Sequence, residues 1–300
     1  MKAPEGGNVD VSDLEEELII PPRSIRYFLS DGGGVDFAAH ALANDGIVTH
    51  GFANFYAIVS RPEKRVVVAI NRMKGRPDDQ VGSVTTTPLR IPMLFDWSKL
   101  PAGLTQHTVL GLMDALYELG PFGFRGPAAP WVLDHLTSPD AGIRTTQVIA
   151  PGYACYSNKF MARAMELLEH DYFYVTSANR SRHVTGADDE PAHYRGSDIK
   201  REFLHEPGFV VLRHPDENAA VSRYPQFAPM STTILAFHRL AEPTPAGRPR
   251  LIVERHGSLH IDDLRPIVER HGFGLALGPK ALVRLSERHY AHPPSLRGRA

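Results

Sequence analysis

Segments with the hydrophobic pattern of strands alternate with segments that have the pattern of helices along most of the 300-residue chain. This alternation restricts the chain to folds in which helices pack on a β-sheet. Val109, Leu112 and Leu116 recur at helical spacing. Gly120 follows them as a stop signal, so a helix is predicted over about 104–120. We therefore expect an α/β (mixed α+β) fold.

The same patterns predict further elements. Helices are expected over about 61–73, 157–171, 260–272 and 281–290, and strands over 54–60, 172–178, 208–214, 231–240 and 250–256. Ser60 and Glu63 form an S-x-x-E pattern, which predicts a capping box at the first of these helices. The Gly- and Pro-rich stretch 120–130 is interpreted as a connection. IVERHG occurs twice, at 252–257 in a strand pattern and at 267–272 in a helix pattern, which indicates coincidence rather than a repeat.

Composition and charge exclude several classes of protein. Lys and Arg number 33 and Asp and Glu 34, and this balance disfavours a globally basic nucleic-acid binder. Cys155 is the single cysteine, so no internal disulfide can form, which fits a reducing cytoplasm. No apolar run approaches the roughly 20 residues that span a bilayer, so no membrane is expected as a partner. Residues 1–17 are polar and acidic, which does not suit a secretory signal and favours a cytoplasmic location.

Two cations stand two residues apart in KGRP at 74–77, in a loop after a predicted helix. Arg76 offers a planar fork and Lys74 a point charge, so the pair can hold a polyphosphate from two sides. Taken alone, the pattern is also common on solvated surfaces.

A second polar string, VTSANRS at 175–181, follows an apolar strand. Ligands of α/β sheets bind outside such strand ends. Ser177 and Asn179 alternate with Ala178, so their side chains can project the same way and hydrogen-bond a phosphate or a carboxylate. An ordinary Ser/Asn turn has the same composition.

KGRP, followed much later in the chain by TSANRS, resembles the paired KxR and SxN signatures of the YrdC-like family of threonylcarbamoyl-adenylate synthases. Three other segments are similar to that family: GIVTHGFANFYAI at 46–58, PMSTTILAF at 229–237 and RLIVERHGSL at 250–259. The resemblance covers about residues 24–275 and implies an open, twisted sheet around a large concave cleft. Residues 1–23 would then be a polar leader and 276–300 a C-terminal extension.

The resemblance also implies an activity and its residues. Members of the family condense threonine, bicarbonate and ATP into threonylcarbamoyl-adenylate and release pyrophosphate, in the service of tRNA modification. If the family's nucleotide-binding positions are carried over to this sequence, the nucleotide contacts would be Lys74, Arg76, Ser177, Asn179, Ser231 and Arg255. Lys74 and Arg76 would also act in catalysis by positioning the phosphates and neutralising their charge. Magnesium is expected with the polyphosphate.

The half of the site that would hold the amino acid departs from the family pattern. The family's PTETVYG loop reads GFANFYA here, so Tyr56 is retained while Asn54 lies in an altered stretch. The family's VRVP has an arginine suited to a carboxylate, and Ile149 stands at that place. We expect Asn54, Tyr56 and Ile149 in the substrate pocket. Either threonine is held differently, or another amino acid or carboxylate takes its place beside bicarbonate.

Two classes of function fit these residues. One is an enzyme that forms an acyl- or carbamoyl-adenylate from ATP. The other is a non-catalytic module of the same fold that binds a nucleotide or RNA. Retained Ser177 and Asn179 favour a small nucleotide, whereas a wider basic band around the cleft would favour RNA. No protein-bound metal is predicted, because HExxH is absent and one cysteine permits no Cys-pair site.

Overall fold

The computed structural model describes residues 26–168, 170–181, 191–203 and 205–290, and the predicted leader at 1–23 lies outside these ranges. Twelve strands in the described ranges form one sheet in the order β1-β9-β2-β3-β8-β4-β7-β5-β10-β11-β12, with β6 paired to β7. Parallel pairs such as β2–β9 and β5–β10 occur beside antiparallel pairs such as β2–β3 and β5–β7. The predicted mixed α/β fold is therefore confirmed.

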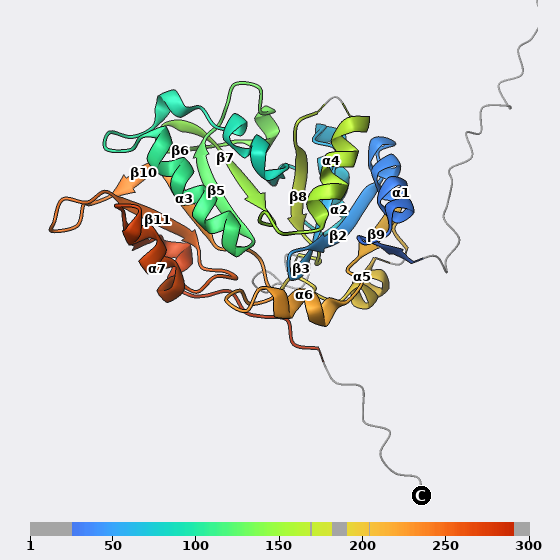
Figure 1. The fold of residues 1–300 in the computed structure, drawn as a ribbon. Coiled ribbons are helices and arrows are strands. Elements are labelled where there is room, and N and C mark those ends of the chain that lie inside the picture. Colours follow the sequence, from blue (N-terminus) through green and yellow to red (C-terminus); the bar gives the residue numbers. More distant parts are fainter. Residues whose placement is uncertain (1–25, 169, 182–190, 204, 291–300) are drawn as a thin grey trace, which may run out of the picture.

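The strands are short, and some follow one another directly while others are separated by helices along the chain. They are β1 Tyr27–Phe28, β2 Ile47–Phe52, β3 Phe55–Ser60, β4 Ser83–Thr85, β5 Phe122–Pro127, β6 Ser138–Asp140, β7 Ile143–Ala150, β8 Phe173–Ser177, β9 Phe209–Arg213, β10 Ile234–Ala241, β11 Arg250–Arg255 and β12 Gly274–Leu277. The α-helices are α1 Gly32–Ala43, α2 Lys64–Met73, α3 Gln106–Leu119, α4 Ser157–Leu167, α5 Gly196–Glu202, α6 Glu217–Arg223 and α7 Ile261–Arg270. In Figure 1, α1 and β2 lie at one end of the sheet, and α7 and β11 lie at the other.

The two faces of the sheet belong to two separate hydrophobic clusters. In β3, Tyr56 and Ile58 join the cluster that contains α2, α3 and α7, whereas Phe55, Ala57 and Val59 join the cluster that contains α1 and α4. Successive side chains of a strand point to opposite faces, so each cluster marks one face. All six residues of β3 are buried because helices or loops pack on both sides of it.

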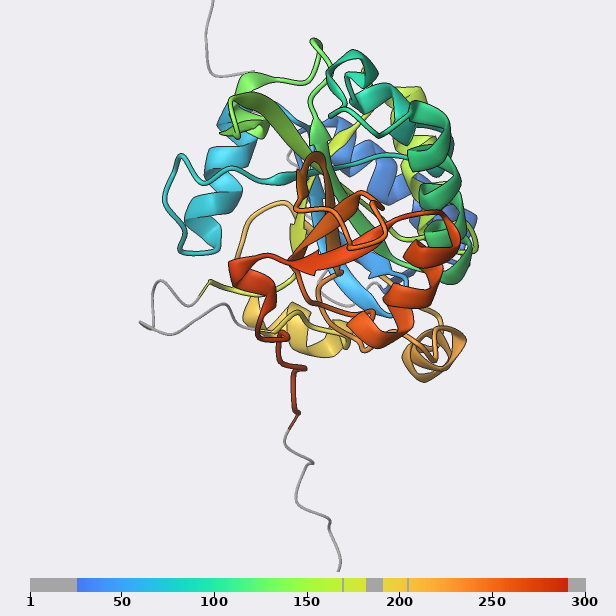
Figure 2. The ribbon, with the colours of Figure 1, turned by 90° about the vertical axis from the view of Figure 1, so that its left-hand side faces the viewer.

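The layer formed by α1 and α4 ends part-way across its face of the sheet. Both helices pack together and lie near β2, and α1 also contacts β1 and β9. The hydrophobic cluster that contains these helices includes no residue of β10 or β11. Figure 2 shows the molecule from the end of the sheet where β10 and β11 lie. The same face of β5 and β10 instead presents Arg125 and Ile234 to a cleft. The open part of this face is therefore where a ligand can reach the sheet.

Most of the predicted elements are present. Helices α2, α3, α4 and α7 lie within the ranges predicted for them, and the two copies of IVERHG lie in β11 and in α7 as expected. The predicted capping box at α2 is wrong. Glu63 is the N-cap and makes no side-chain cap bond, while Ser60 ends β3 and donates its hydroxyl to Arg61 O. Ser60 belongs to β3 and not to the helix start, because the backbone of Ser60 pairs with Tyr174 of β8.

The interpretation of 120–130 as a connection is also wrong, because β5 lies there in the middle of the sheet. Its glycines make room for neighbouring side chains. A Cβ atom added at Gly126 would lie 2.1 Å from Cζ of Phe237, whose ring stacks on Trp97 at 5.7 Å and packs edge-on against Phe95 at 4.9 Å. Glycine inside a strand often marks such a close approach.

The helix predicted over 281–290 does not form. After a 3₁₀ turn at Pro279–Ala281, residues 282–290 have no helical structure, and their polar groups bond to distant segments. Arg284 donates to the carbonyls of Gly257 and Ser258. The Tyr290 hydroxyl accepts hydrogen bonds from the backbone N–H groups of Tyr194 and Arg195. These tertiary bonds outweigh the weak helical pattern of the segment.

Two buried histidines lie beside one another at β2. The His214 ring packs against Gly51, where an added Cβ would lie 2.4 Å from Nε2. Burial lowers the pKa of His50 to about 3 and the pKa of His214 to about 4. Within the described ranges, Nε2 of each ring has no hydrogen-bond partner. Both rings are therefore neutral at pH 7.

We expect Gly126→Ala to destabilise the protein by about 1–3 kcal/mol, because the packed Phe237 ring has to shift. Urea unfolding measures the change. Gly111→Ala in α3 is the matched control, because its Cβ would meet only Cδ2 of His271 at 3.8 Å. That control should stabilise by about 0.5–1 kcal/mol, as alanine does in a helix. Equal stability of the Gly126→Ala and wild-type proteins would contradict the packing.

We expect the free energy of unfolding to fall as the pH drops from about 6.5 toward 4. In this range His50 and His214 are protonated in the unfolded chain but remain neutral in the folded protein. Each ring therefore lowers the free energy of unfolding by up to about 1.4 kcal/mol per pH unit. Urea titrations across this range measure the slope. His214→Gln should flatten it, and His107→Gln, a substitution at an exposed site in α3, should not. An unchanged slope in His214→Gln would contradict the assignment.

Candidate functional site

A cleft of about 790 Å³ opens on the uncovered part of the sheet. Its floor is built from β3, β8, β4, β7, β5 and β10, and one wall from β11 and the turn that follows β12. This volume lies in the range of small-molecule and cofactor sites.

Cations outnumber carboxylates along the cleft. Five cationic residues line it, namely Arg76, Arg125, Arg239, Arg255 and Lys280, and Glu254 is the carboxylate among the described lining residues. A surplus of positive charge in a concave site favours an anionic ligand.

Arg76 and Ser177 are brought together at this cleft. Helix α2 ends at Met73 with Lys74 as its C-cap, and Gly75 follows with a φ of 71°, the left-handed conformation that turns the chain at a helix end. The turn directs Arg76 to the cleft, where its Nη1 donates to Thr176 Oγ1 at 2.8 Å. Ser177 is the next residue of β8 and also lines the cleft.

Lys74 lies behind this edge of the cleft and is fully buried. Its ammonium group donates to the backbone carbonyls of Ser177 and Asn179, and its own carbonyl accepts from Ser181 N at 2.7 Å. Asn179 is 1% exposed, and its side-chain amide donates to Arg180 O at 2.9 Å. Neither Lys74 nor Asn179 lines the cleft. In this structure Lys74 holds the loop that follows β8 in place.

Ser231 and Arg255, which the resemblance gave as further nucleotide contacts, line the opposite side of the cleft. Arg255 donates from Nε to Thr232 O at 2.7 Å and from Nη2 to Thr232 Oγ1 at 2.9 Å. These bonds orient the guanidinium group at the end of β11.

Of the three residues predicted in the substrate pocket, Ile149 lines the cleft, and Asn54 and Tyr56 do not. The Asn54 amide donates to Phe227 O at 2.7 Å. The Tyr56 hydroxyl donates to Glu217 Oε1 at 2.8 Å and accepts from His214 N. Burial and the Glu217 carboxylate raise the pKa of Tyr56 far above its ordinary value, so the hydroxyl remains protonated.

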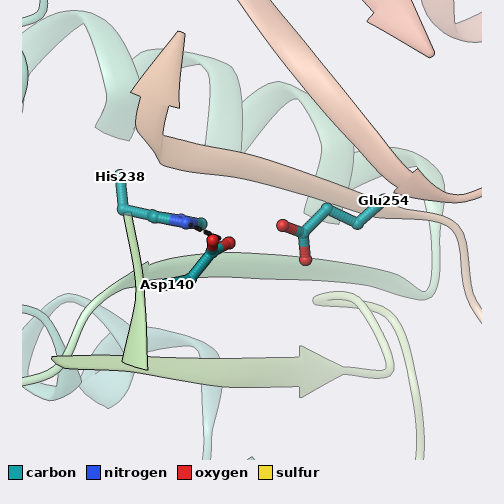
Figure 3. A group of neighbouring side chains, drawn as sticks. All are labelled: Asp140, His238 and Glu254. Atoms are coloured by element: carbon teal, nitrogen blue, oxygen red, sulfur yellow. Dashed lines mark hydrogen bonds and ion pairs between the residues drawn. The ribbon is translucent and has the colours of Figure 1, made fainter. Parts of the chain in front are cut away.

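Asp140, His238 and Glu254 come together in one cluster (Figure 3), and of these three Glu254 lines the cleft. His238 Nε2 lies 2.8 Å from Asp140 Oδ2. Arg239 bonds to both carboxylates, and Arg125 donates to Glu254 Oε2 at 3.3 Å. Partial burial acts to raise the pKa of Asp140, but the bonds from His238 and Arg239 prevail and lower it. Two arginines thus neutralise two carboxylates, and the cluster is an ion-pair network rather than a metal site.

Three polar side chains on the floor, those of Ser83, Arg125 and Gln147, were not identified from the sequence. Gln147 Nε2 donates to Ser83 Oγ at 2.5 Å, and Arg125 is the cross-strand partner of Gln147. Gln147 and Arg125 lie on adjacent central strands, and both side chains line the cleft. The sequence of β5 carries little strand signal, because its two glycines and its proline favoured the interpretation as a connection.

Three solved structures share this architecture. Sua5 of P. abyssi, as a variant with two substitutions, is 14% identical with a TM-score of 0.58, and the match covers 84% of this chain. P. abyssi Sua5 complexed with L-threonine is 15% identical with a TM-score of 0.55 and 87% coverage. A hypothetical protein from Streptococcus mutans is 14% identical with a TM-score of 0.57, and the match covers 81% of this chain and 94% of that one.

These likenesses show that the chain has the fold of the Sua5 and YrdC-like proteins, as the sequence resemblance predicted. The matches span 65% and 66% of the two Sua5 chains. No protein-family profile and no curated protein sequence matches the chain. In the described ranges, none of the helices has the length and apolar character needed to cross a membrane.

We expect Lys74→Met to destabilise the protein by about 1–3 kcal/mol, because the buried carbonyls of Ser177 and Asn179 lose a charged donor. Lys64→Met is the matched control, since Lys64 is an exposed residue of the same helix. Urea unfolding of both variants measures the difference. Similar stabilities for the two would show that the ammonium group does not hold the loop.

Proposed function

We propose that this protein is an ATP-dependent nucleotidyl-transfer enzyme that resembles threonylcarbamoyl-AMP synthase. It forms an acyl- or carbamoyl-adenylate, releases pyrophosphate, and uses an acyl substrate other than threonine. The observation that carries the proposal is the positive cleft, in which Arg76 and Ser177 meet although they come from distant parts of the chain. The Sua5-like fold supports it.

The phosphates of ATP lie at the Arg76 edge of the cleft in this proposal. The guanidinium fork of Arg76 and the Ser177 hydroxyl hold one side, and Arg255 and Ser231 hold the other. Their charge also stabilises the transition state as negative charge builds up on the phosphates. Lys74 and Asn179 contribute by fixing the loop that follows Ser177, and a direct phosphate contact by either would require that loop to open.

The lining offers little to a magnesium ion. Both oxygens of Glu254 already accept bonds from arginines, so no uncommitted carboxylate is present among the described lining residues. Magnesium would have to be carried by the phosphates and by water. The small-molecule complex of the P. abyssi relative favours a small ligand over RNA.

We expect Arg76→Ala to weaken ATP binding by about 1.5–3 kcal/mol, as for other hydrogen bonds to charged groups. Arg76→Lys should also weaken it, because one ammonium group cannot replace a bidentate fork. Calorimetric titration of ATP into the full chain measures both. Arg72→Lys is the matched control, because Arg72 binds Asp78 on the surface and does not line the cleft. Wild-type affinity in both Arg76 variants would reject the proposed function.

A further inference from the structure

One part of the cleft has an apolar lining, formed by side chains that are at most 8% exposed. Ser83 of β4 interrupts it, because β4 lies between β8 and β7. Six lining residues belong to the hydrophobic cluster that α1 and α4 cover elsewhere, and we call them the apolar wall: Phe52, Phe55, Ala57, Ile149, Val175 and Ala192. The wall is where that cluster emerges from under the helix layer. Phe52 and Phe55 are in contact there, with ring centroids 5.5 Å apart.

The wall continues across the floor through apolar side chains. Ile149 is paired with Gly123, which is paired in turn with Ile234 on β10. A Cβ added at Gly123 would lie 2.9 Å from Cγ1 of Ile234 and 3.4 Å from Cγ1 of Ile149. The two isoleucines therefore close over the glycine and extend the apolar surface to β10.

Polar groups adjoin the wall on two sides. Ala57 is paired with Ser177, so the wall meets the proposed phosphate site directly. Gln147 and Arg125 stand two residues along from Ile149 and Gly123 on the same face, about 7 Å away at strand spacing. A ligand that lies on the wall can thus direct an anionic end toward cationic or amide groups.

The wall has nothing to receive an ammonium group. Its six side chains have no hydrogen-bond acceptor, and Glu254, the lining carboxylate of the described residues, is bound by Arg125 and Arg239. An ammonium group placed against apolar side chains loses its hydration without compensation. The surface therefore discriminates against zwitterionic amino acids.

We propose that the second substrate is an apolar monocarboxylate without an α-ammonium group, which lies on the apolar wall. This inference rests on the proposed function for its chemistry. A carboxylate oxygen of the acid attacks the α-phosphorus of ATP and forms the mixed anhydride. The bond from that phosphorus to the oxygen bridging the β-phosphate breaks, and its electron pair leaves with pyrophosphate. No oxidant, reductant or bicarbonate takes part.

The test uses pairs of acids that differ only by the ammonium group. Isovalerate is compared with valine, and hydrocinnamate with phenylalanine, with threonine beside them. Each is titrated calorimetrically into the full chain with and without ATP, and pyrophosphate release is assayed with and without bicarbonate. We expect each apolar acid to exceed its amino-acid partner by about tenfold or more in affinity and in kcat/KM, since a site without a partner for a charged group rejects it strongly.

Two variants in one strand link the preference to the wall. Ile149→Thr keeps the β-branched shape but places a hydroxyl in the wall, and should reduce the preference for the apolar acids several-fold. Val148→Thr is the control, because Val148 is buried in the opposite cluster and faces away from the cleft. It should cost stability and leave the preference unchanged.

The outcomes separate this inference from the proposed function. ATP binding without any preference for the apolar acids overturns the inference alone. Robust turnover that requires threonine and bicarbonate overturns the inference and the exclusion of threonine in the proposed function, but leaves the adenylate chemistry standing. Absence of ATP binding overturns the proposed function. In that case the titrations without ATP still decide the inference, because the wall should bind hydrocinnamate more tightly than phenylalanine.

Discussion

The helix layer of α1 and α4 ends part-way across the sheet, and the position of this boundary decides where chemistry can occur. On the other face, α2, α3 and α7 pack on strands from β3 to β11. On the open face the same strands have to present side chains to solvent or to a ligand. The polarity of the cleft lining therefore depends on the part of the sheet beneath it. The lining is apolar near α1 and α4, where residues of the buried cluster reach the cleft, and polar where β5, β7 and β11 lie uncovered.

Charges at the two ends of the cleft are organised differently. At the Asp140 end, two carboxylates and two arginines compensate one another, so that the network adds little net field. At the Arg76 end, the guanidinium group bonds to a neutral hydroxyl, and its charge remains available to a ligand. The positive charge of Arg76 therefore lies beside Ser177, next to the apolar wall.

The sequence predicted the fold class and most helices because their apolar stripes are long and periodic. It failed at β5, where Gly123 and Gly126 make room for side chains of other strands, because the identity of such neighbours is not encoded locally. The motifs correctly joined 74–77 to 175–181. They could not indicate that Lys74 would be buried under its own loop. Tyr56 was expected in the pocket, but all six residues of β3 are buried, so the sequence pattern of that strand could not indicate which side chains face the cleft. Asn54 was expected there too, but it lies in the turn between β2 and β3 and donates to Phe227 O.

Full burial of the Lys74 ammonium group gives the loop after β8 an intrinsic reporter. Reagents that acylate amines act on the neutral, accessible amine, and Lys74 is 0% exposed beneath the carbonyls of Ser177 and Asn179. Exposed lysines such as Lys64 and Lys280 react with such a reagent at once. Lys74 reacts only during the moments when the loop lifts. The rate at which Lys74 is modified therefore measures how often the loop after β8 opens at the Arg76 edge of the cleft.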